Sequence, residues 1–375
     1  MLDPQKFLKS IRNQGVEFTA GVPDSLLKDF CSVMTDEGSD IIAANEGGAI
    51  ALAMGHHLAT GKIPLVYMQN SGFGNCVNPL TSLADSDVYS IPMLLMIGWR
   101  GEPGVKDEPQ HVKQGRISEE LLQTMEINYA VLSDDESEAQ NQLASAFETM
   151  NQSKAPYALL VKKGIFDKYK LQTKVENPYT INREEVIDWM LQKMEEEAVV
   201  VSTTGKSSRE VFEIRAKHNM GHGKDFLTVG GMGHASQIAL GIALSKKNRP
   251  VYCLDGDGAT IMHMGAGAII GNQPSKNYKH ILINNGCHES VGGQATVGFA
   301  IDFQKIAEAS GYKQTWLVTN MDELPEAWDL FQNTEGPVLI EIRTTEASRA
   351  DLGRPTTTPV QNKEAFMKNL SRNDR

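Results

Sequence analysis

The segments LDGDGAT (254–260) and ILINNGCHES (281–290) decide the fold of this chain. Each contains the end of a short apolar run, which is followed by glycine, Asp or Asn residues. Twenty-five residues separate Gly258 from Asn284, enough for a helical connection between two strands. Short apolar runs joined in this way are typical of parallel strands, whose carboxyl ends meet at one edge of a sheet. We therefore expect the GDG and NN segments to lie together at a ligand-binding edge.

Similar apolar runs recur in both halves of the chain. They are IIAA (41–44), PLVYM (64–68), PMLLMIG (92–98) and YALLVKK (157–163), then AVVVS (198–202), PVYCLDGDG (250–258), HILINN (280–285) and PVLIEIR (337–343). The pattern predicts an α/β protein with two domains, each a parallel sheet flanked by helices. We expect the domains to span 1–166 and 184–375, with a polar linker at 167–183.

Composition excludes several classes of protein. A net charge of −11 disfavours nonspecific binding to nucleic acid or to an anionic membrane. No apolar run approaches the roughly 18 residues that span a bilayer, and the N-terminus lacks a secretion signal. The four cysteines are scattered without a CxxC pair, which indicates neither a zinc site nor a disulfide framework. A cytoplasmic location is the simple expectation.

The GDG and NN segments suit a phosphate and a hard cation. Glycines let a backbone approach a phosphate closely. The carboxylate of Asp257 and an Asn amide oxygen are ligands that Mg²⁺ accepts. Either segment alone would more often be an ordinary tight turn, and only their combination and spacing indicate a binding site.

The combination resembles the signature of thiamine-diphosphate-dependent enzymes. That resemblance implies Mg²⁺ held by the side chains of Asp257 and Asn285 and by the backbone carbonyl of Cys287. It places Gly256, Gly258 and Ala259 against the cofactor diphosphate. In the upstream GGMGHASQIALGIAL (230–244), Gly231 and Met232 match the turn whose bulky apolar residue supports the bent cofactor. A core methionine is the ordinary alternative for Met232.

The N-terminal half resembles the pyrimidine-binding domain of the same family. Thiamine chemistry needs a carboxylate against the aminopyrimidine ring, and Glu46 in IIAANEGGAIALAMG is the candidate. A helix-start Glu favoured by the helix dipole is its ordinary alternative. The segment YMQNSGFGNCVNPL (67–80) matches the glycine-rich turn at the pyrimidine, with a phenylalanine in place of the usual proline. Its expected contacts are Gly72, Phe73, Gly74 and Asn75.

Other segments concern the substrate. Asp24 in FTAGVPDSLL (18–27) matches an active-site Asp of related 2-oxo acid decarboxylases, although it could equally cap the following helix. Three basic loops on an acidic protein could bind a dianion. Their candidates are Arg100, Lys106 and His111 in 98–116, Lys206 and Arg209 in 202–210, and Arg349 in 346–355.

Together these loops resemble the phosphonopyruvate decarboxylases and the related sulfopyruvate decarboxylases. The two halves are often separate chains in the latter, so their fusion here favours phosphonopyruvate. The resemblance implies decarboxylation with Glu46 activating the cofactor and with Asp24 or His111 in protonation. It also implies a homodimer or larger oligomer with the site at the subunit interface. The larger relatives' middle domain is missing, which argues against the alternative of acetolactate-type carboligation. A cofactor-binding sensor or inactive subunit would be expected to lack Glu46 or Asp257, and no convincing GxGxxG supports a nicotinamide enzyme.

Overall fold

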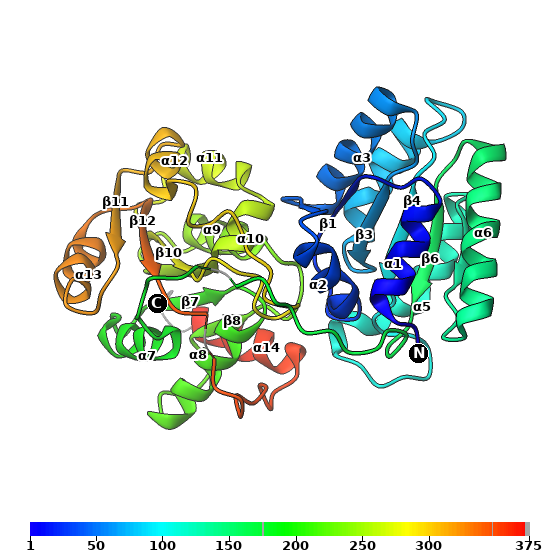
Figure 1. The fold of residues 1–375 in the computed structure, drawn as a ribbon. Coiled ribbons are helices and arrows are strands. Elements are labelled where there is room, and N and C mark those ends of the chain that lie inside the picture. The colour runs from blue at the N-terminus through cyan, green and yellow to red at the C-terminus, as the bar shows by residue number, and fades with distance from the viewer. Residues whose placement is uncertain (175, 347, 372–375) are drawn as a thin grey trace. The chain divides into compact units, whose positions relative to one another are not determined.

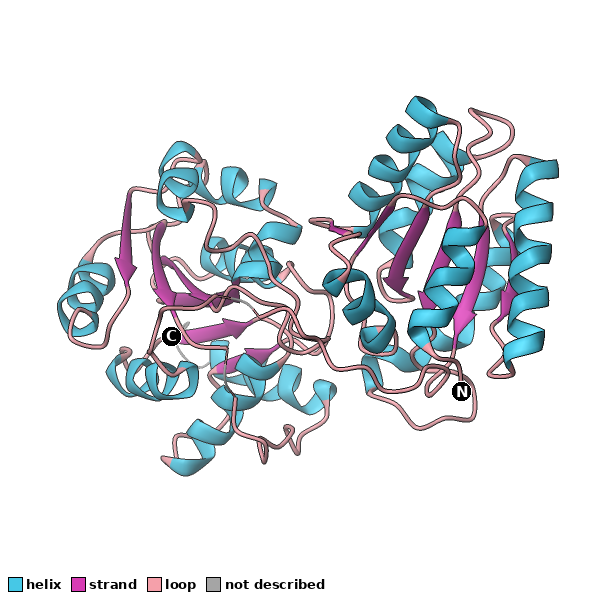
Figure 2. Cartoon of the chain, in the orientation of Figure 1, coloured by secondary structure: helices cyan, strands magenta, loops and turns pink. Residues whose placement is uncertain are grey.

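The chain folds into two α/β units. The computed structural model describes residues 1–174, 176–346 and 348–371. Unit 1 comprises Met1–Val175 with His288–Gln294, and unit 2 comprises Glu176–Cys287 with Ala295–Arg375. Each unit is a six-stranded sheet with helices on both faces, as predicted (Figures 1 and 2).

Unit 1 has a fully parallel sheet in the order β2-β1-β3-β4-β6-β5. Its strands are β1 (Thr19–Gly21), β2 (Ile41–Ile42), β3 (Leu65–Gln69), β4 (Leu94–Gly98), β5 (Asn128–Val131) and β6 (Tyr157–Val161). Its helices are α1 (Pro4–Asn13), α2 (Lys28–Asp36), α3 (Glu46–Thr60), η1 (Phe73–Cys76), α4 (Val77–Pro79), η2 (Leu80–Ala84), α5 (Pro109–Thr124) and α6 (Glu136–Ser153).

The central strands of unit 1 are apolar because both of their faces are covered. Side chains of α1, α2 and α6 pack on one face, and those of α3 and α5 pack on the other. Successive residues of β3 illustrate the alternation, since Tyr67 belongs to the first core and Met68 to the second. This double burial explains why the strands read as continuous apolar runs.

Unit 2 has a second parallel sheet, in the order β11-β12-β10-β9-β7-β8. Its strands are β7 (Val199–Ser202), β8 (Asp225–Leu227), β9 (Val251–Gly256), β10 (Tyr278–Asn284), β11 (Gln314–Val318) and β12 (Val338–Arg343). Its helices are α7 (Arg183–Lys193), α8 (Lys206–Lys217), α9 (Ala235–Ser245), α10 (Asp257–Met262), α11 (Gly265–Gly271), α12 (Phe303–Ala309), α13 (Leu324–Asn333) and α14 (Pro359–Leu370).

The two sheets share one topology. With the strands of each unit numbered one to six along the chain, both sheets have the order 2-1-3-4-6-5. Helices α7, α8 and α13 cover one face of the second sheet, while α9, α11, α12 and α14 cover the other. In both units the strand order reverses between the first and third strands, and ligands of open α/β sheets bind outside the carboxyl ends at such points.

The described helices contain no membrane-span candidate. None of them has both the length and the apolar character that crossing a bilayer requires.

Candidate active site

Glu46 is a buried carboxylate at the first residue of α3. Asn45 caps the helix, and its side chain accepts a hydrogen bond from Gly48 N. The Glu46 carboxylate in turn accepts a hydrogen bond of 2.7 Å from Asn75 Nδ2. With one hydrogen bond from Asn75, the buried carboxylate still has acceptor positions for a further partner.

The turn at 72–75 packs directly against Glu46. A Cβ atom on Gly72 would overlap the Glu46 carboxylate, and one on Gly47 would lie 2.9 Å from Asn75 O. Only glycine therefore fits both positions without a shift. The structure thus brings Glu46, Gly72 and Asn75 together, whereas the Phe73 side chain is buried in the core. If Phe73 contacts a ligand, its backbone must supply the contact.

Asp24 is fully buried at the end of β1 and closes the turn before α2. Its Oδ2 accepts hydrogen bonds from Leu26 N and Leu27 N, and its Oδ1 accepts one from Gln69 Nε2 at 2.6 Å. Burial raises its pKa above the ordinary value despite these donors. The turn-capping role is therefore real, and the raised pKa also favours retention of a proton.

The predicted loop 98–116 is a loop only as far as Glu108, because α5 begins at Pro109. The loop places Arg100 close to Asp24 within unit 1. Arg100 forms a two-pronged ion pair with Asp107 and donates from Nη1 to Ser25 Oγ at 2.8 Å. His111 lies in the first turn of α5, where burial and the nearby Arg100 charge lower its pKa. Lys106 is exposed. Arg100 is thus held in place by its own loop rather than extended into solvent.

In unit 2, Asp257 begins α10 directly after β9 and is buried. Thr296 donates its hydroxyl proton to the Asp257 carboxylate. Burial raises the pKa of Asp257 to about 6, and the nearby Glu341 adds to the rise. A carboxylate so placed is costly to ionise unless a cation binds beside it.

The NN pair lies beside Asp257, because β9 and β10 pair in parallel with Ile283 opposite Gly256. The two asparagines have different roles. Asn284 Oδ1 accepts from Gly286 N at 3.2 Å, whereas Asn285 Oδ1 accepts from Cys287 N at 3.2 Å. Gly286 has a φ of +69°, which glycine adopts at little cost. The two hydrogen bonds fix the turn that presents Asn285 and Cys287.

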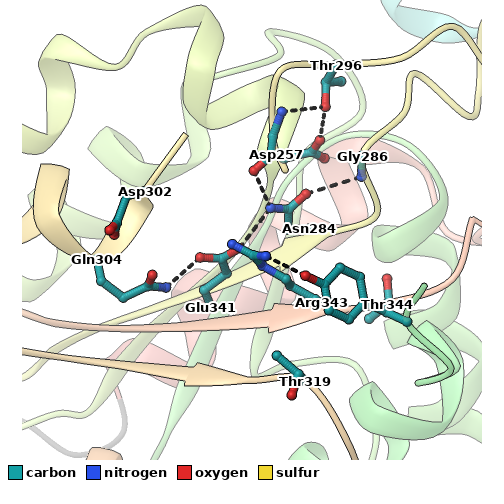
Figure 3. A network of polar contacts seen from close by, with 12 residues as sticks. Asp257, Asn284, Gly286, Thr296, Asp302, Gln304, Thr319, Glu341, Arg343 and Thr344 are labelled. Atoms are coloured by element: carbon teal, nitrogen blue, oxygen red, sulfur yellow. Dashed lines mark hydrogen bonds and ion pairs between the residues drawn. The ribbon is translucent and has the colours of Figure 1, made fainter. Parts of the chain in front are cut away.

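A buried network beneath this turn was missed by the sequence reasoning (Figure 3). Asn284 Nδ2 donates to Gly298 O and to Glu341 Oε1, each at 2.8 Å. Glu341 is fully buried on β12 and also accepts from Arg343 Nε at 2.8 Å and from Gln304. The only sequence signal was a charged residue inside the apolar run PVLIEIR (337–343). Glu341 thus holds the amide that organises the 284–287 turn.

The glycine-rich loop at 230–234 packs against the start of α10. Gly231 and Gly233 have φ values of +64° and +82°. A Cβ on Gly233 would lie 2.9 Å from Ala259 O and would overlap the His263 ring. Met232, which is partly buried, is therefore held close to the GDG segment in space.

The basic candidates of unit 2 have different surroundings. Lys206 begins α8 and donates from Nζ to Ser348 Oγ at 2.6 Å. Arg209 lies one turn later and is partly buried. Arg349 forms ion pairs with the carboxylates of Glu184, Glu213 and Asp351. Arg349 is therefore the candidate whose charge is already most fully compensated.

The residues present suit thiamine diphosphate with a divalent cation. Asp257 supplies a buried negative charge, and the neighbouring turn supplies amide and carbonyl oxygens. Two left-handed glycines and the GDG segment leave the backbone open to a phosphate. In unit 1, Glu46 and the Gly72 turn offer a carboxylate at a sheet edge.

Comparison with known proteins agrees with this arrangement. Residues 5–124 match the family described as thiamine pyrophosphate enzyme, N-terminal TPP binding domain, and residues 203–342 match its C-terminal TPP binding domain. A phosphonopyruvate decarboxylase of Streptomyces viridochromogenes is 33% identical over 96% of this chain and 93% of its own. A phosphonopyruvate decarboxylase of Streptomyces hygroscopicus is 32% identical over 96% and 92%.

A more distant relative corrects one sequence argument. A sulfopyruvate decarboxylase of Methanosarcina acetivorans is 24% identical over 88% of this chain and 87% of its own. A single chain therefore also spans both halves in a sulfopyruvate decarboxylase, so fusion does not by itself favour phosphonopyruvate. The match to both binding domains and the full-length relatives establish the family. The chain belongs to the thiamine pyrophosphate enzymes, among the decarboxylases related to phosphonopyruvate decarboxylase.

Proposed function

We propose that this enzyme decarboxylates 3-phosphonopyruvate to phosphonoacetaldehyde and CO₂, with thiamine diphosphate and Mg²⁺, as a step of phosphonate biosynthesis. The main support is the 33% identity to a phosphonopyruvate decarboxylase along nearly the whole chain, against 24% to a sulfopyruvate decarboxylase. The first reaction is the better-supported one, and decarboxylation of sulfopyruvate is the second candidate.

Each unit would supply a distinct part of the chemistry. When bound, thiamine diphosphate supplies the electron sink for the bond that breaks as CO₂ leaves. Mg²⁺ would be held by Asp257, Asn285 and the Cys287 carbonyl. The diphosphate would lie against Gly256, Gly258 and Ala259. The bent cofactor would be supported by Gly231 and Met232. Glu46 would exchange a proton with the aminopyrimidine, and its hydrogen bond from Asn75 fixes the carboxylate.

Asp24 and His111 are the candidates for proton transfer to the product carbon. The pKa of Asp24 is raised, so its carboxyl holds a proton more readily than an ordinary Asp. The pKa of His111 is lowered, which keeps the imidazole neutral over a wider pH range. The two shifts bring the pKa values of Asp24 and His111 closer together, so both groups stay candidates for the proton donor.

The phosphonate would be bound by cations. The substrate carboxylate must leave as neutral CO₂, so binding energy is better placed on the phosphonate, which does not react. The candidates are Arg100, Lys106, Lys206, Arg209 and Arg349. Arg349 ranks last because three carboxylates already compensate its charge.

The protein would act as a homodimer or larger oligomer with the site at the subunit interface. Support comes from α3, which begins with Glu46 and carries Leu52 and Leu58 exposed on its surface. Sedimentation of the intact protein with cofactor tests this expectation, and a monomer that is fully active would contradict it.

The substrate proposal is tested by CO₂ release from phosphonopyruvate, sulfopyruvate and pyruvate with thiamine diphosphate and Mg²⁺ present. We expect the highest kcat/KM for phosphonopyruvate. Alanine variants of the five cationic candidates and of His111 then locate the phosphonate contacts. A true contact should cost roughly 2–5 kcal/mol in transition-state binding for phosphonopyruvate and much less for pyruvate. A higher kcat/KM for sulfopyruvate would show that sulfopyruvate is the substrate. Equal losses for phosphonopyruvate and pyruvate in every variant would show that the phosphonate pocket lies elsewhere.

A further inference from the structure

Three potential metal ligands meet on the face of the second sheet that α9, α11 and α12 cover. Cys253 and Asp255 lie on β9, and His280 lies on β10 directly opposite Cys253 in the strand register. All three side chains are buried, and one ligand atom of each lies within 4.8 Å of the others. Asp255 lies two residues before Asp257, and the cluster shares no residue with the proposed Mg²⁺ site (β10 is labelled in Figure 1).

Two polar atoms of this cluster lack the hydrogen bonds that burial demands. Asp255 Oδ1 accepts from Gly256 N at 3.0 Å. Asp255 Oδ2 and His280 Nε2 lie 3.7 Å apart, and neither has a hydrogen-bond partner among the described residues. Both residues line a cavity of about 30 Å³. Buried polar atoms without partners are uncommon in proteins, so the pair points to a bound species.

The surroundings orient these ligands and make an uncompensated charge costly. His280 Nδ1 lies 3.0 Å from Tyr312 Oη, and a hydrogen bond there fixes the ring with Nε2 toward Asp255. The cluster lies within an apolar core that includes Val251, Ile270 and Leu339. Burial and the neighbouring Asp255 raise the pKa of the Cys253 thiol, so the thiolate needs a cation to form.

We propose that Cys253, Asp255 and His280 bind one divalent transition-metal ion of the zinc class, with water in the cavity as a fourth ligand. A thiolate, a carboxylate and a neutral imidazole carry two negative charges, which a divalent ion cancels in this apolar core. Sulfur and nitrogen ligands select zinc-class ions and disfavour Mg²⁺, which takes oxygen ligands.

The geometry needs only a small closure to form such a site. Tetrahedral zinc bonds of about 2.0–2.3 Å hold the donor atoms about 3.3–3.8 Å apart, so the side chains would close by about 1 Å. The ion would link β9 to β10 just before the residues proposed to hold Mg²⁺. Cysteine spacing gave no sign of it, because the three ligands come together only through the register of two strands.

The test uses Co²⁺ as a spectroscopic substitute for zinc in the full-length protein. Purified enzyme is equilibrated with Co²⁺ in excess Mg²⁺ and thiamine diphosphate, so that the proposed oxygen-rich site is occupied. We expect one equivalent of retained cobalt and a thiolate-to-cobalt charge-transfer band. Zn²⁺ should abolish the band by displacement, and metal analysis should then find one retained zinc. Absence of the band, or no retained cobalt or zinc, would overturn the proposal and leave a water-filled Asp255–His280 pair.

Variants assign the band to this cluster. Cys253→Ser should remove the band, and His280→Gln should lower Co²⁺ affinity by at least about tenfold. Cys31→Ser is the matched control, since Cys31 is also a buried thiol but lies in unit 1, and it should keep the band. Circular dichroism checks that each variant is folded. Should Cys253→Ser fail to fold, His280→Gln decides alone, and unchanged Co²⁺ affinity in it would contradict the site.

Discussion

The two units share one strand order but place different chemistry at the same edge of the sheet. In unit 1, Asp24, Glu46 and the 72–75 turn follow the first, second and third strands. In unit 2, the loop with Lys206, the Met232 loop and Asp257 follow the corresponding strands. The topology thus fixes where functional side chains can stand, whereas local residues decide what they do.

The two units differ in the side chains that donate hydrogen bonds to their buried carboxylates. Glu46 and Asp24 accept hydrogen bonds from the amide side chains of Asn75 and Gln69. Asp257 has the Thr296 hydroxyl as its side-chain donor, and its pKa is raised to about 6. We therefore propose that Glu46 and Asp24 of unit 1 take part in proton exchange, whereas Asp257 of unit 2 faces the Mg²⁺ ion of the cofactor.

The largest effect is expected from Glu46→Gln. The amide keeps the shape of the side chain but cannot exchange a proton as a carboxylate does. Turnover should fall by roughly 10²–10⁴-fold, while Mg²⁺-dependent cofactor binding by calorimetry changes little. Glu37→Gln, on the exposed end of α2, is the control and should keep full turnover. Turnover near wild type in Glu46→Gln would remove Glu46 from the mechanism.

Asp257→Ala should have the opposite effect: cofactor binding should fall sharply, whereas the chemistry of cofactor that is bound should change less. If Asp257 is a Mg²⁺ ligand as proposed, its loss should cost about 3 kcal/mol or more in cofactor binding, roughly a hundredfold or more in Kd. Calorimetric titration with thiamine diphosphate at several Mg²⁺ concentrations measures this loss, and excess Mg²⁺ should restore only part of it. Binding that keeps the wild-type Mg²⁺ dependence would show that Asp257 is not a ligand.

The raised pKa of Asp257 predicts that the free energy of unfolding of the cofactor-free protein falls as the pH rises. The folded state holds the Asp257 proton more tightly than the unfolded chain, whose reference pKa is 3.8. The resulting stability is present below about pH 4 and is lost as the pH rises through about 6. Asp257→Asn cannot ionise, so at pH 8 it should be more stable than wild type by up to about 3 kcal/mol, with little difference at pH 4. Denaturant unfolding without Mg²⁺ decides this, and a wild type that is as stable as Asp257→Asn at pH 8 would contradict the raised pKa of Asp257.

The smallest effect is expected from Glu341→Gln, which acts through Asn284. The substitution removes the charge that holds the Asn284 amide and Arg343. Cofactor and Mg²⁺ affinity should fall by about 10–100-fold, the order of loss found for outer-shell residues of metal sites, because Asn284 fixes the turn that carries Asn285 and Cys287. Glu210→Gln breaks another buried ion pair of unit 2, with Arg183, and it should lower thermal stability without changing Mg²⁺ affinity. Equal Mg²⁺ effects in both variants would mean that Glu341 acts only on stability.

The sequence predicted the sheets because their strands are buried on both faces. The runs at 64–68, 92–98 and 157–163 correspond to β3, β4 and β6, whose side chains enter two cores. The run at 41–44 extends two residues beyond β2 (Ile41–Ile42). No predicted run corresponds to β5, β8 or β11, which are short strands at or near the sheet edges. The shared strand order was also hidden, because topology leaves no sequence repeat when the two cores are filled by different residues.

Residues of the candidate site were predicted where they belong to a local sequence motif. Residues that reach the site only through the pairing of strands were missed. Asp257, Asn285 and Glu46 stand in recognisable segments. Glu341 and Thr296 lie far from those segments, and only strand pairing and the following loop bring them to Asn284 and Asp257. The ion pairs of Arg100 and Arg349 were likewise invisible, because a basic loop gives no sign of the carboxylates that will face it.

The division between the units is tested most directly by hydrogen exchange at the reactive thiazolium carbon of bound thiamine diphosphate. The exchange rate is measured by quenched-flow NMR for wild type, Glu46→Gln and Asp257→Ala. Cofactor and Mg²⁺ are present at concentrations that saturate each of the three proteins. We expect slow exchange in Glu46→Gln although the cofactor is bound. We expect faster exchange, closer to wild type, in Asp257→Ala once the cofactor is forced to bind. Wild-type exchange in Glu46→Gln, or equally slow exchange in both variants, would contradict the account.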